Sequence, residues 1–229
     1  MKLLLTSAGV KNASIREALL ELLGQPIAQC DALAIPTAGY GHPWVKPIRA
    51  YEFLTGRGTT PMVELGWKSV GVLELTALPS IDGNRWREWV NDADVLLVNG
   101  GDALYLAHWM RESGLADMLP TLEDKVWVGL SGGSMVMAPR IGEEFVGCEQ
   151  PSRTDEALGV VDFAIFPHLD HPELPTNTLP AAQKWASKLG IPAYAVDDAT
   201  AFKVVDGKVD VVSEGNWHYF GPEGDLTPS

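Results

Sequence analysis

The segment at residues 126–139 constrains this chain more than any other, because a run of strand-favouring residues enters the glycine-rich turn Gly129-Leu-Ser-Gly-Gly. An apolar run without proline or glycine then continues to Pro139, so the pattern predicts a strand, a sharp turn and a helix, with Ser131 at the turn. In an elbow of this kind the hydroxyl projects above the carboxyl end of the sheet, and the helix N-terminus favours negative charge nearby. The segment therefore predicts a serine that acts as an acyl-transfer nucleophile.

The Gly-x-Ser-x-Gly pattern also arises by chance in chains with many glycines, and this one contains 23. The assignment of Ser131 therefore depends on finding its partners elsewhere in the sequence. Ser134 offers a second hydroxyl in the same segment. It falls within the first predicted helical turn, where helix capping or contact with solvent is the simpler role.

Composition limits the classes of protein that this chain can be. Its 229 residues are 46% hydrophobic, which is enough for a substantial core. A net charge of −13 argues against nucleic-acid and anionic-membrane partners, whose surfaces demand basic patches. No run approaches the ~18 apolar residues of a membrane span, and the first residues lack the pattern of a secretory signal. Cys30 and Cys148 show neither metal-site spacing nor a disulfide framework, so we expect a cytoplasmic protein.

Apolar strand patterns alternate with helical patterns along most of the chain. This alternation predicts right-handed crossovers and an α/β fold with a mostly parallel sheet flanked by helices on both faces. Asp206-Gly207, between two apolar runs, predicts a C-terminal β-hairpin. No repeat or linker is visible, so we expect residues 1–229 to form a single domain, with residues 221–229 as a loose tail. The expected strands cover residues 3–7, 32–35, 69–75, 95–98, 126–128, 160–166 and 192–196.

Candidate partners for Ser131 follow two later strands. His168 and His171 come after the strand at 160–166, and Asp197 and Asp198 come after the strand at 192–196. The carboxyl ends of the strands in an open α/β sheet meet at one edge, where ligands bind. A serine hydroxyl needs a neighbouring base and an acid that orients the base. His168 directly follows a proline, whose fixed φ holds it rigidly, so it is preferred over His171 as the base.

A second strand–glycine–helix unit lies at residues 95–112, where a fully apolar strand runs into Asn99-Gly-Gly-Asp. Two adjacent glycines allow the backbone to approach a ligand and to direct N–H groups at it. A tight turn with no ligand is the alternative interpretation.

Taken together, these motifs resemble those of peptidase E (aspartyl dipeptidase), cyanophycinase and their relatives. The resembling segments occur in order: Val98-Asn-Gly-Gly-Asp-Ala-Leu-Tyr-Leu, Arg111-Glu-Ser-Gly-Leu, Gly129-Leu-Ser-Gly-Gly, Phe166-Pro-His and Val196-Asp-Asp-Ala-Thr-Ala. The resemblance implies a serine hydrolase with a class I glutamine-amidotransferase-like, flavodoxin-like fold. It also implies Ser131 as nucleophile, His168 as base, Asp198 as acid in place of the family's usual Glu, and the N–H groups of Gly101 and Gly132 as oxyanion donors.

Three departures from the family pattern concern the site. Gly100-Gly-Asp-Ala replaces Gly-Gly-Asn-Thr, which brings the Asp102 carboxylate near the expected oxyanion hole, where it would hinder an anion or contact a substrate amine. Ser131-Gly-Gly-Ser replaces Ser-Ala-Gly-Ala. The family's arginine-containing segment after the histidine is missing, since residues 169–229 contain no arginine, so a preference for N-terminal Asp is not expected. Gly100, Asp102 and His171 are the expected substrate contacts.

The resulting prediction is a serine peptidase that hydrolyses dipeptides or small amides through an acyl-enzyme. We expect a monomer or homodimer with a small peptide substrate and with no metal and no cofactor. One alternative is an esterase of α/β-hydrolase type that uses Ser131, Asp198 and His218. Another is a non-catalytic small-molecule-binding module of amidotransferase-like fold. A serine at the elbow, where the amidotransferases use cysteine, argues against glutaminase chemistry.

Overall fold

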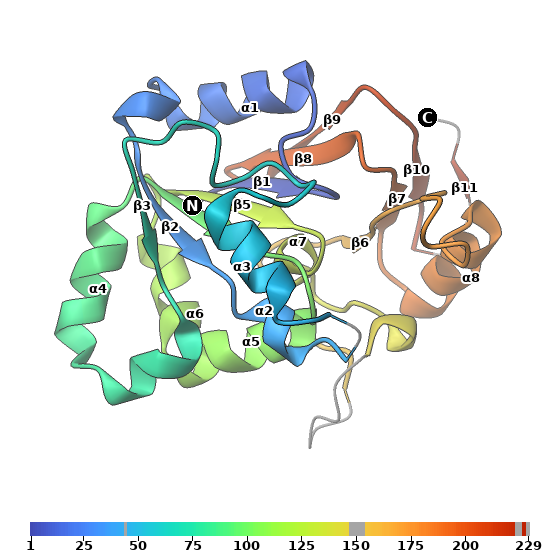
Figure 1. The fold of residues 1–229 in the computed structure, drawn as a ribbon. Helices are drawn as coiled ribbons and strands as arrows, with labels where there is room; N and C mark the ends of the chain where they lie inside the picture. Colours follow the sequence, from blue (N-terminus) through green and yellow to red (C-terminus); the bar gives the residue numbers. More distant parts are fainter. Residues whose placement is uncertain (44, 147–153, 223–225, 228–229) are drawn as a thin grey trace.

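The large sheet of the computed structural model has seven strands in the order β3-β2-β4-β5-β1-β8-β9 (Figure 1). The structure describes residues 1–43, 45–146, 154–222 and 226–227. The first five strands in that order are parallel, β8 runs antiparallel to β1, and β9 runs antiparallel to β8. This confirms the predicted, mostly parallel α/β fold. The strands are β1 (Lys2–Thr6), β2 (Asp31–Ile35), β3 (Ser69–Val72), β4 (Val95–Val98), β5 (Val126–Leu130), β8 (Thr200–Val205) and β9 (Lys208–Ser213).

Helices cover both faces of this sheet, which explains why β4 and β5 are buried along their whole length. Alternate residues of β1 face opposite cores, as strand periodicity requires. Leu3 and Leu5 pack in the cluster that contains residues of α4 and α5, while Leu4 packs in the cluster that contains residues of α1. In Figure 1, α1 lies on one side of the sheet and α4, α5 and α6 lie on the other. The helices are α1 (Ala13–Leu23), α4 (Gly83–Asp92), α5 (Ala103–Glu112) and α6 (Leu115–Met118).

A second sheet of four strands, in the order β11-β10-β7-β6, lies beside the first and was not predicted from the sequence. β8 occupies the edge of β1 opposite β5, so the later strands cannot extend the large sheet there. An apolar cluster joins this sheet to α8 through Phe166, Trp185 and Phe220. The elements are β6 (Ala164–Phe166), α8 (Leu179–Leu189), β7 (Ala193–Val196), β10 (Trp217–Phe220) and β11 (Leu226–Thr227).

The sequence predicted a hairpin and a loose tail in the C-terminal region. The hairpin is confirmed, because β8 and β9 pair in antiparallel register around Asp206 and Gly207, both with positive φ. The tail expected at residues 221–229 includes a two-residue strand, Leu226–Thr227, which pairs with β10. Residues 223–225 and 228–229 lie outside the described residues.

Several predicted element boundaries are wrong. The strand expected at 69–75 ends at Val72, and the strand expected at 160–166 begins at Ala164. The segment after β2, rich in proline and glycine, contains a four-residue helix, α2 (Ala38–Gly41), and leads into the helix α3 (Ile48–Thr55), neither of which was predicted. The helix after Ser131, α7 (Gly132–Met135), is one turn long. It stops because the carbonyl groups of residues 136–138 accept hydrogen bonds from the backbone of residues 158–161.

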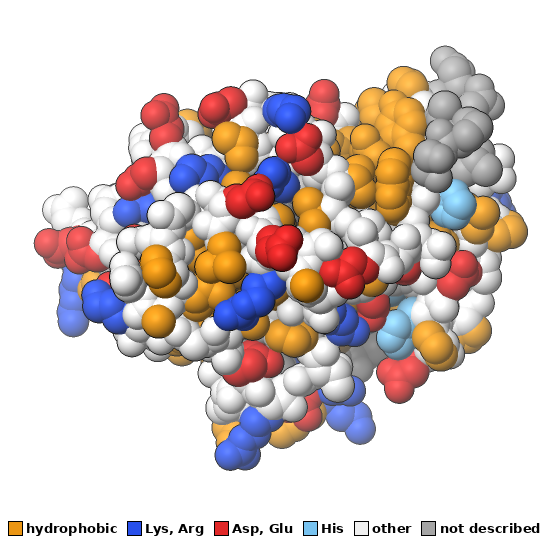
Figure 2. Space-filling model, turned by 90° about the horizontal axis from the view of Figure 1, so that it is seen from above, with side chains coloured by type: hydrophobic (Ala, Val, Ile, Leu, Met, Phe, Trp, Pro, Cys, Tyr) orange, Lys and Arg blue, Asp and Glu red, His pale blue; other side chains and the backbone are white. Residues whose placement is uncertain are grey.

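The surface carries charges of both signs. On the face shown in Figure 2, Lys and Arg side chains are interspersed with Asp and Glu rather than gathered in one basic patch. No helix within the described ranges is long and apolar enough to cross a membrane.

Candidate active site

Ser131 sits at a sharp turn between β5 and α7, as the sequence predicts. Its backbone has φ 48° and ψ −111°, a combination that non-glycine residues rarely adopt. Hydrogen bonds hold the turn on both sides, because the Ser131 N–H donates to the Thr6 carbonyl at 3.0 Å and its own carbonyl accepts from Ser134 N–H at 2.8 Å. The local backbone is therefore fixed with the Ser131 hydroxyl at the carboxyl end of the sheet.

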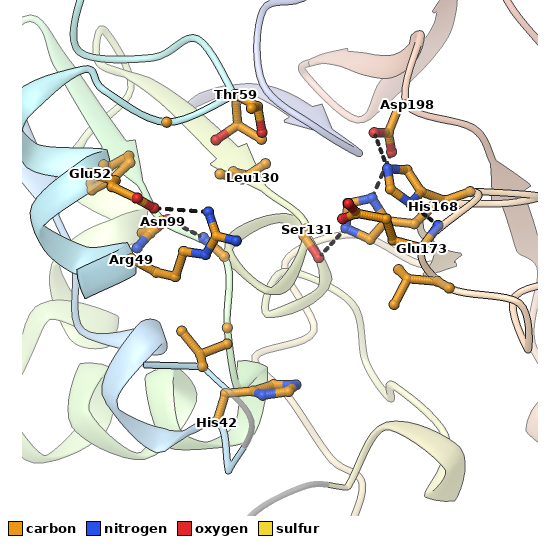
Figure 3. A pocket seen from close by; sticks show the side chains of 18 of the residues that line it. His42, Arg49, Glu52, Thr59, Asn99, Leu130, Ser131, His168, Glu173 and Asp198 are labelled. Atoms are coloured by element: carbon orange, nitrogen blue, oxygen red, sulfur yellow. Dashed lines mark hydrogen bonds and ion pairs between the residues drawn. The ribbon is translucent and has the colours of Figure 1, made fainter. Parts of the chain in front are cut away.

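His168 connects the Ser131 hydroxyl to a carboxylate. Its Nε2 lies 2.9 Å from Ser131 Oγ, and its Nδ1 lies 2.6 Å from Asp198 Oδ1 (Figure 3). The histidine follows β6 with a left-handed backbone, φ 58°, and its N–H donates to the Ser7 hydroxyl at 2.9 Å. The structure thus brings together the three side chains that the sequence analysis selected from three separate strand ends.

The Asp198 carboxylate is surrounded by donors. Lys11 Nζ lies 3.0 Å from Oδ2, and His171 Nε2 lies 3.6 Å from the same oxygen. Burial alone would raise the pKa of Asp198, but the hydrogen bonds and positive charges contributed by His168 and Lys11 hold that pKa well below its ordinary value. The carboxylate is therefore ionised at neutral pH, in the state that orients an imidazole and stabilises its cation.

The neighbouring candidates have other partners. The Asp197 carboxylate accepts hydrogen bonds from the N–H groups of Ala199 at 3.0 Å and Asn216 at 2.5 Å, so it organises the turn after β7. The buried Ser134 hydroxyl donates to the Thr6 carbonyl at 2.8 Å and points away from the site. Geometry thus distinguishes Asp198 from Asp197 and Ser131 from Ser134, which the residues alone had left open.

The two glycine turns meet backbone to backbone beside Ser131. A Cβ on Gly132 would lie 2.3 Å from the Gly101 carbonyl oxygen, and a Cβ on Gly101, whose φ is 139°, would lie 2.2 Å from the Ala38 carbonyl oxygen. Only glycine fits either position. No hydrogen bond from either N–H group reaches another of the residues that the structure describes.

Two cavities flank Ser131. Both are lined by Ser131, His168 and Gly101, but their other lining residues differ in character. The first has a volume of about 460 Å³ and is lined largely by polar and charged side chains from α3, the 58–60 loop and the segment after β6. The second has a volume of about 390 Å³ and is lined mainly by apolar side chains, including Met135 and Phe145. A substrate with two small moieties, one on each side of the reacting bond, fits this division.

The first cavity contains cationic side chains that the sequence analysis did not expect at this site. Arg49 of α3 lines it, as does Lys11. Arg49 Nη1 lies 2.9 Å from Glu52 Oε2, and Lys11 pairs with Asp198. Together with Glu173, three carboxylates and two cations line the cavity. Two cations therefore reach the first cavity, and each of them has a carboxylate partner.

The predicted substrate contacts all lie at the cavities. Gly100 and His171 line the first, and Asp102 lines the second. Asp102 Oδ1 accepts from Tyr105 N–H at 2.8 Å and caps α5, while Oδ2 is buried with no hydrogen-bond partner among the described residues. His171 Nδ1 accepts from Glu173 N–H at 3.1 Å, so its Nε2 carries the proton that faces Asp198.

His218 does not belong to this group. It lies on β10, in register with Ala195 of the second sheet, and it lines neither cavity. His168 already occupies the place beside Ser131 that the esterase alternative assigned to His218. Within the described ranges there is also no cluster of three or more His, Cys, Asp or Glu residues placed to hold a metal ion.

Sequence reasoning missed Ser7, Lys11 and Arg49. Ser7 and Lys11 carried a usable signal, because they follow the carboxyl end of the first strand and so lie at the edge where the other candidates gather. Arg49 carried none, since its position depends on the path of the 36–60 segment over the sheet edge.

A serine hydroxyl bonded to an imidazole that is bonded in turn to a carboxylate, on an α/β sheet, is the arrangement of a serine hydrolase. The model of peptidase family S51 matches residues 3–212. The chain therefore belongs to peptidase family S51, as the motif resemblance indicated.

Two solved structures are similar in fold to this chain. A candidate peptidase E protein from Listeria monocytogenes EGD-e superposes with a TM-score of 0.66 at 18% identity, covering 93% of this chain and 98% of the other. A peptidase from an acI-B1 Actinobacterium superposes with a TM-score of 0.70 at 22% identity, covering 96% of this chain and 91% of the other. At these identities the likeness shows a shared fold. A comparison with curated proteins gives no match.

Proposed function

We propose that this chain is a serine exopeptidase of dipeptidase type, which hydrolyses dipeptides or small amides through an acyl-enzyme on Ser131. The observation that carries the proposal is the unbroken hydrogen-bond chain from Ser131 through His168 to Asp198, at the junction of two cavities. Each cavity is large enough for one amino-acid residue or a similar small group. The substrate is therefore a short peptide or small amide.

In the first half of the reaction, His168 Nε2 accepts the Ser131 proton as Oγ attacks the substrate carbonyl carbon. The resulting imidazolium is stabilised by Asp198, which stays ionised. His168 then gives the proton to the leaving amine, and the C–N bond breaks. In the second half, water attacks the ester by the same proton transfers in reverse order, which releases the acid and restores the serine.

The developing negative charge falls on the substrate carbonyl oxygen. The N–H groups of Gly101 and Gly132 are the proposed donors to that oxygen, because their backbones touch each other beside Ser131 and neither bonds elsewhere among the described residues. Loss of one such donor in other serine enzymes costs about 10²- to 10³-fold in kcat.

The direct test is covalent labelling of the nucleophile. A fluorophosphonate should modify Ser131, identified by mass spectrometry of the labelled peptide, and Ser131→Ala should abolish both labelling and dipeptide hydrolysis without loss of the fold. The matched control is Ser134→Ala, three residues away, which should still be labelled at Ser131. Labelling at another residue, or hydrolysis by Ser131→Ala at the rate of the unaltered protein, would refute the proposal.

The same experiment tests the two alternatives. A binding module that keeps the pocket without chemistry would show neither labelling nor turnover across a dipeptide panel. An esterase would be labelled but would turn over only esters.

A further inference from the structure

The two oxygens of the Asp198 carboxylate have different partners. Oδ1 faces His168 Nδ1 at 2.6 Å, and Oδ2 faces Lys11 Nζ at 3.0 Å (Figure 3 shows the Asp198–His168–Ser131 side). A carboxylate held on one oxygen only can rotate about its terminal torsion, which is broad. A second contact on Oδ2 restricts that rotation and keeps Oδ1 directed at the imidazole.

Lys11 belongs to a short loop that contacts both His168 and the segment that carries Asp198. The loop joins β1 to α1 at residues 7–12. At its start the Ser7 hydroxyl accepts from the His168 N–H at 2.9 Å, and at its end Asn12 Nδ2 donates to the Ala199 carbonyl at 2.8 Å. Lys11 adds the contact to the Asp198 side chain between them. The loop therefore connects the segment that carries the base to the segment that carries the acid.

We propose that Lys11 is a positioning residue of the active site, which fixes the Asp198 carboxylate toward His168 and disfavours protonation of the His168 ring through its positive charge. This inference rests on the proposed function for its kinetic consequences, but its structural part does not.

Other charged groups line the same cavity as this pair, namely Glu173 and the ion pair between Arg49 and Glu52. His168 is in contact with Asp198 and Ser131, and its ring centre lies 6.1 Å from that of His171. Asp198 faces His168, Lys11 and His171, and the Ser7 hydroxyl lies 3.5 Å from Oδ1. Lys11 is thus the one Lys or Arg side chain among the described residues that pairs with Asp198. Removing it leaves the Asp198 carboxylate with the two imidazoles and the Ser7 hydroxyl as its side-chain neighbours.

The test compares Lys11→Met, which keeps the length of the side chain but not its charge, with Lys11→Arg, which keeps the charge. Two quantities are measured: the NMR titration midpoint of the His168 ring, assigned with a His168→Asn variant, and the pH profile of kcat/KM. In Lys11→Met we expect the His168 midpoint and the acidic limb of the profile to rise together by about 0.5–1 pH unit. We also expect the plateau of kcat/KM to fall on the order of 10-fold, from imperfect positioning. Lys11→Arg should restore both quantities.

The matched control is Lys68→Met, which removes an ion pair of the same type, with Asp31, at the opposite end of the sheet. It should leave the titration and the profile unchanged. If Lys11→Met does not fold, Lys11→Gln takes its place, with folding checked by circular dichroism.

An unchanged His168 midpoint in Lys11→Met would overturn the proposal. It would also be overturned if Lys11→Arg were as impaired as Lys11→Met. A loss of kcat with no shift in either quantity would mean a merely structural role, and would overturn it also. The NMR titration does not depend on turnover. If the proposed dipeptidase activity is wrong but the role of Lys11 is right, the His168 midpoint will still shift in Lys11→Met while the unaltered protein hydrolyses no dipeptide.

Discussion

Replacing Asp198 by asparagine tests how the acid controls the tautomer of the histidine. Lys11 has only hydrogen-bond donors, so in Asp198→Asn the amide oxygen should face Lys11 and the amide NH₂ should face His168. The NH₂ donates, so Nδ1 must accept, and the ring proton then sits on Nε2, where it prevents acceptance of the Ser131 proton. The new amide also cannot offset the imidazolium charge.

The expected loss in kcat is about 10⁴-fold, the size seen when other triads lose their acid in this way. This loss corresponds to about 5 kcal/mol in the activation barrier. The assay is steady-state release of the free amine from a dipeptide, with circular dichroism as the check on folding. Asp197→Asn is the matched control, because it makes the same chemical change one residue away. It should keep kcat within a few-fold while losing on the order of 1–3 kcal/mol in the free energy of unfolding, since its carboxylate accepts hydrogen bonds from the backbone N–H groups of Ala199 and Asn216.

A double variant provides a second test of the tautomer argument. With Lys11→Met added to Asp198→Asn, only the more distant His171 N–H, at 3.6 Å, still favours the amide oxygen away from His168, so the double variant should be no slower than Asp198→Asn alone. A kcat for Asp198→Asn within 10-fold of the unaltered protein would refute the tautomer argument, and so would a double variant slowed by the full product of the two single losses.

The remaining predictions concern the base, the oxyanion donors, the substrate and the pH dependence. His168→Ala should lower kcat as much as loss of the nucleophile, whereas His171→Ala and His218→Ala should cost far less, as single-turnover rates will show. Gly101→Ala should lower kcat at least 10²-fold, because its Cβ would collide with a backbone oxygen and displace the donor; near-normal turnover would exclude Gly101 from that role. Neutral dipeptides should be cleaved at least as well as Asp-Xaa peptides, since carboxylates outnumber cations in the first cavity, and a panel cleaved only at Asp-Xaa would contradict this. The pKa of Asp198 is lowered on folding, so the ionised carboxylate stabilises the folded protein. This contribution to the free energy of unfolding is complete above about pH 4 and is lost as the pH falls through the lowered pKa. In acid titrations of stability, the unaltered protein should therefore lose more stability than Asp198→Asn.

Much of the fold followed from local patterns in the sequence. The apolar runs at β4 and β5 are buried on both faces, and such runs alternating with helices leave few alternatives to a parallel sheet. Ser131, His168 and Asp198 each lie within two residues of a strand end, which was enough to group them as candidates, although β6 and β7 belong to the second sheet and not to the sheet of β5. The fold class followed from the strand and helix patterns, and the family followed from the resemblance of the motifs.

The features that were missed depend on contacts between distant segments. The second sheet exists because β8 pairs with β1, and no local pattern specifies which edge a C-terminal hairpin will take. Helix α3 is eight residues long, too short for periodicity to distinguish it from a loop rich in proline and glycine. Arg49 enters the first cavity only because α3 packs over the sheet edge, and the single helical turn at α7 is set by hydrogen bonds to residues 158–161.

The loop at residues 7–12 has a consequence for biosynthesis. It lies near the start of the chain, yet its partners, His168 and Asp198, are made more than 150 residues later, and β8 must pair with β1 to bring Asp198 into place. A ribosome-bound chain therefore carries Ser131 long before it carries a working base and acid. Hydrolytic activity should appear only after residue 205 has left the ribosome and docked, so incomplete chains and early folding intermediates cannot cleave peptides in their surroundings.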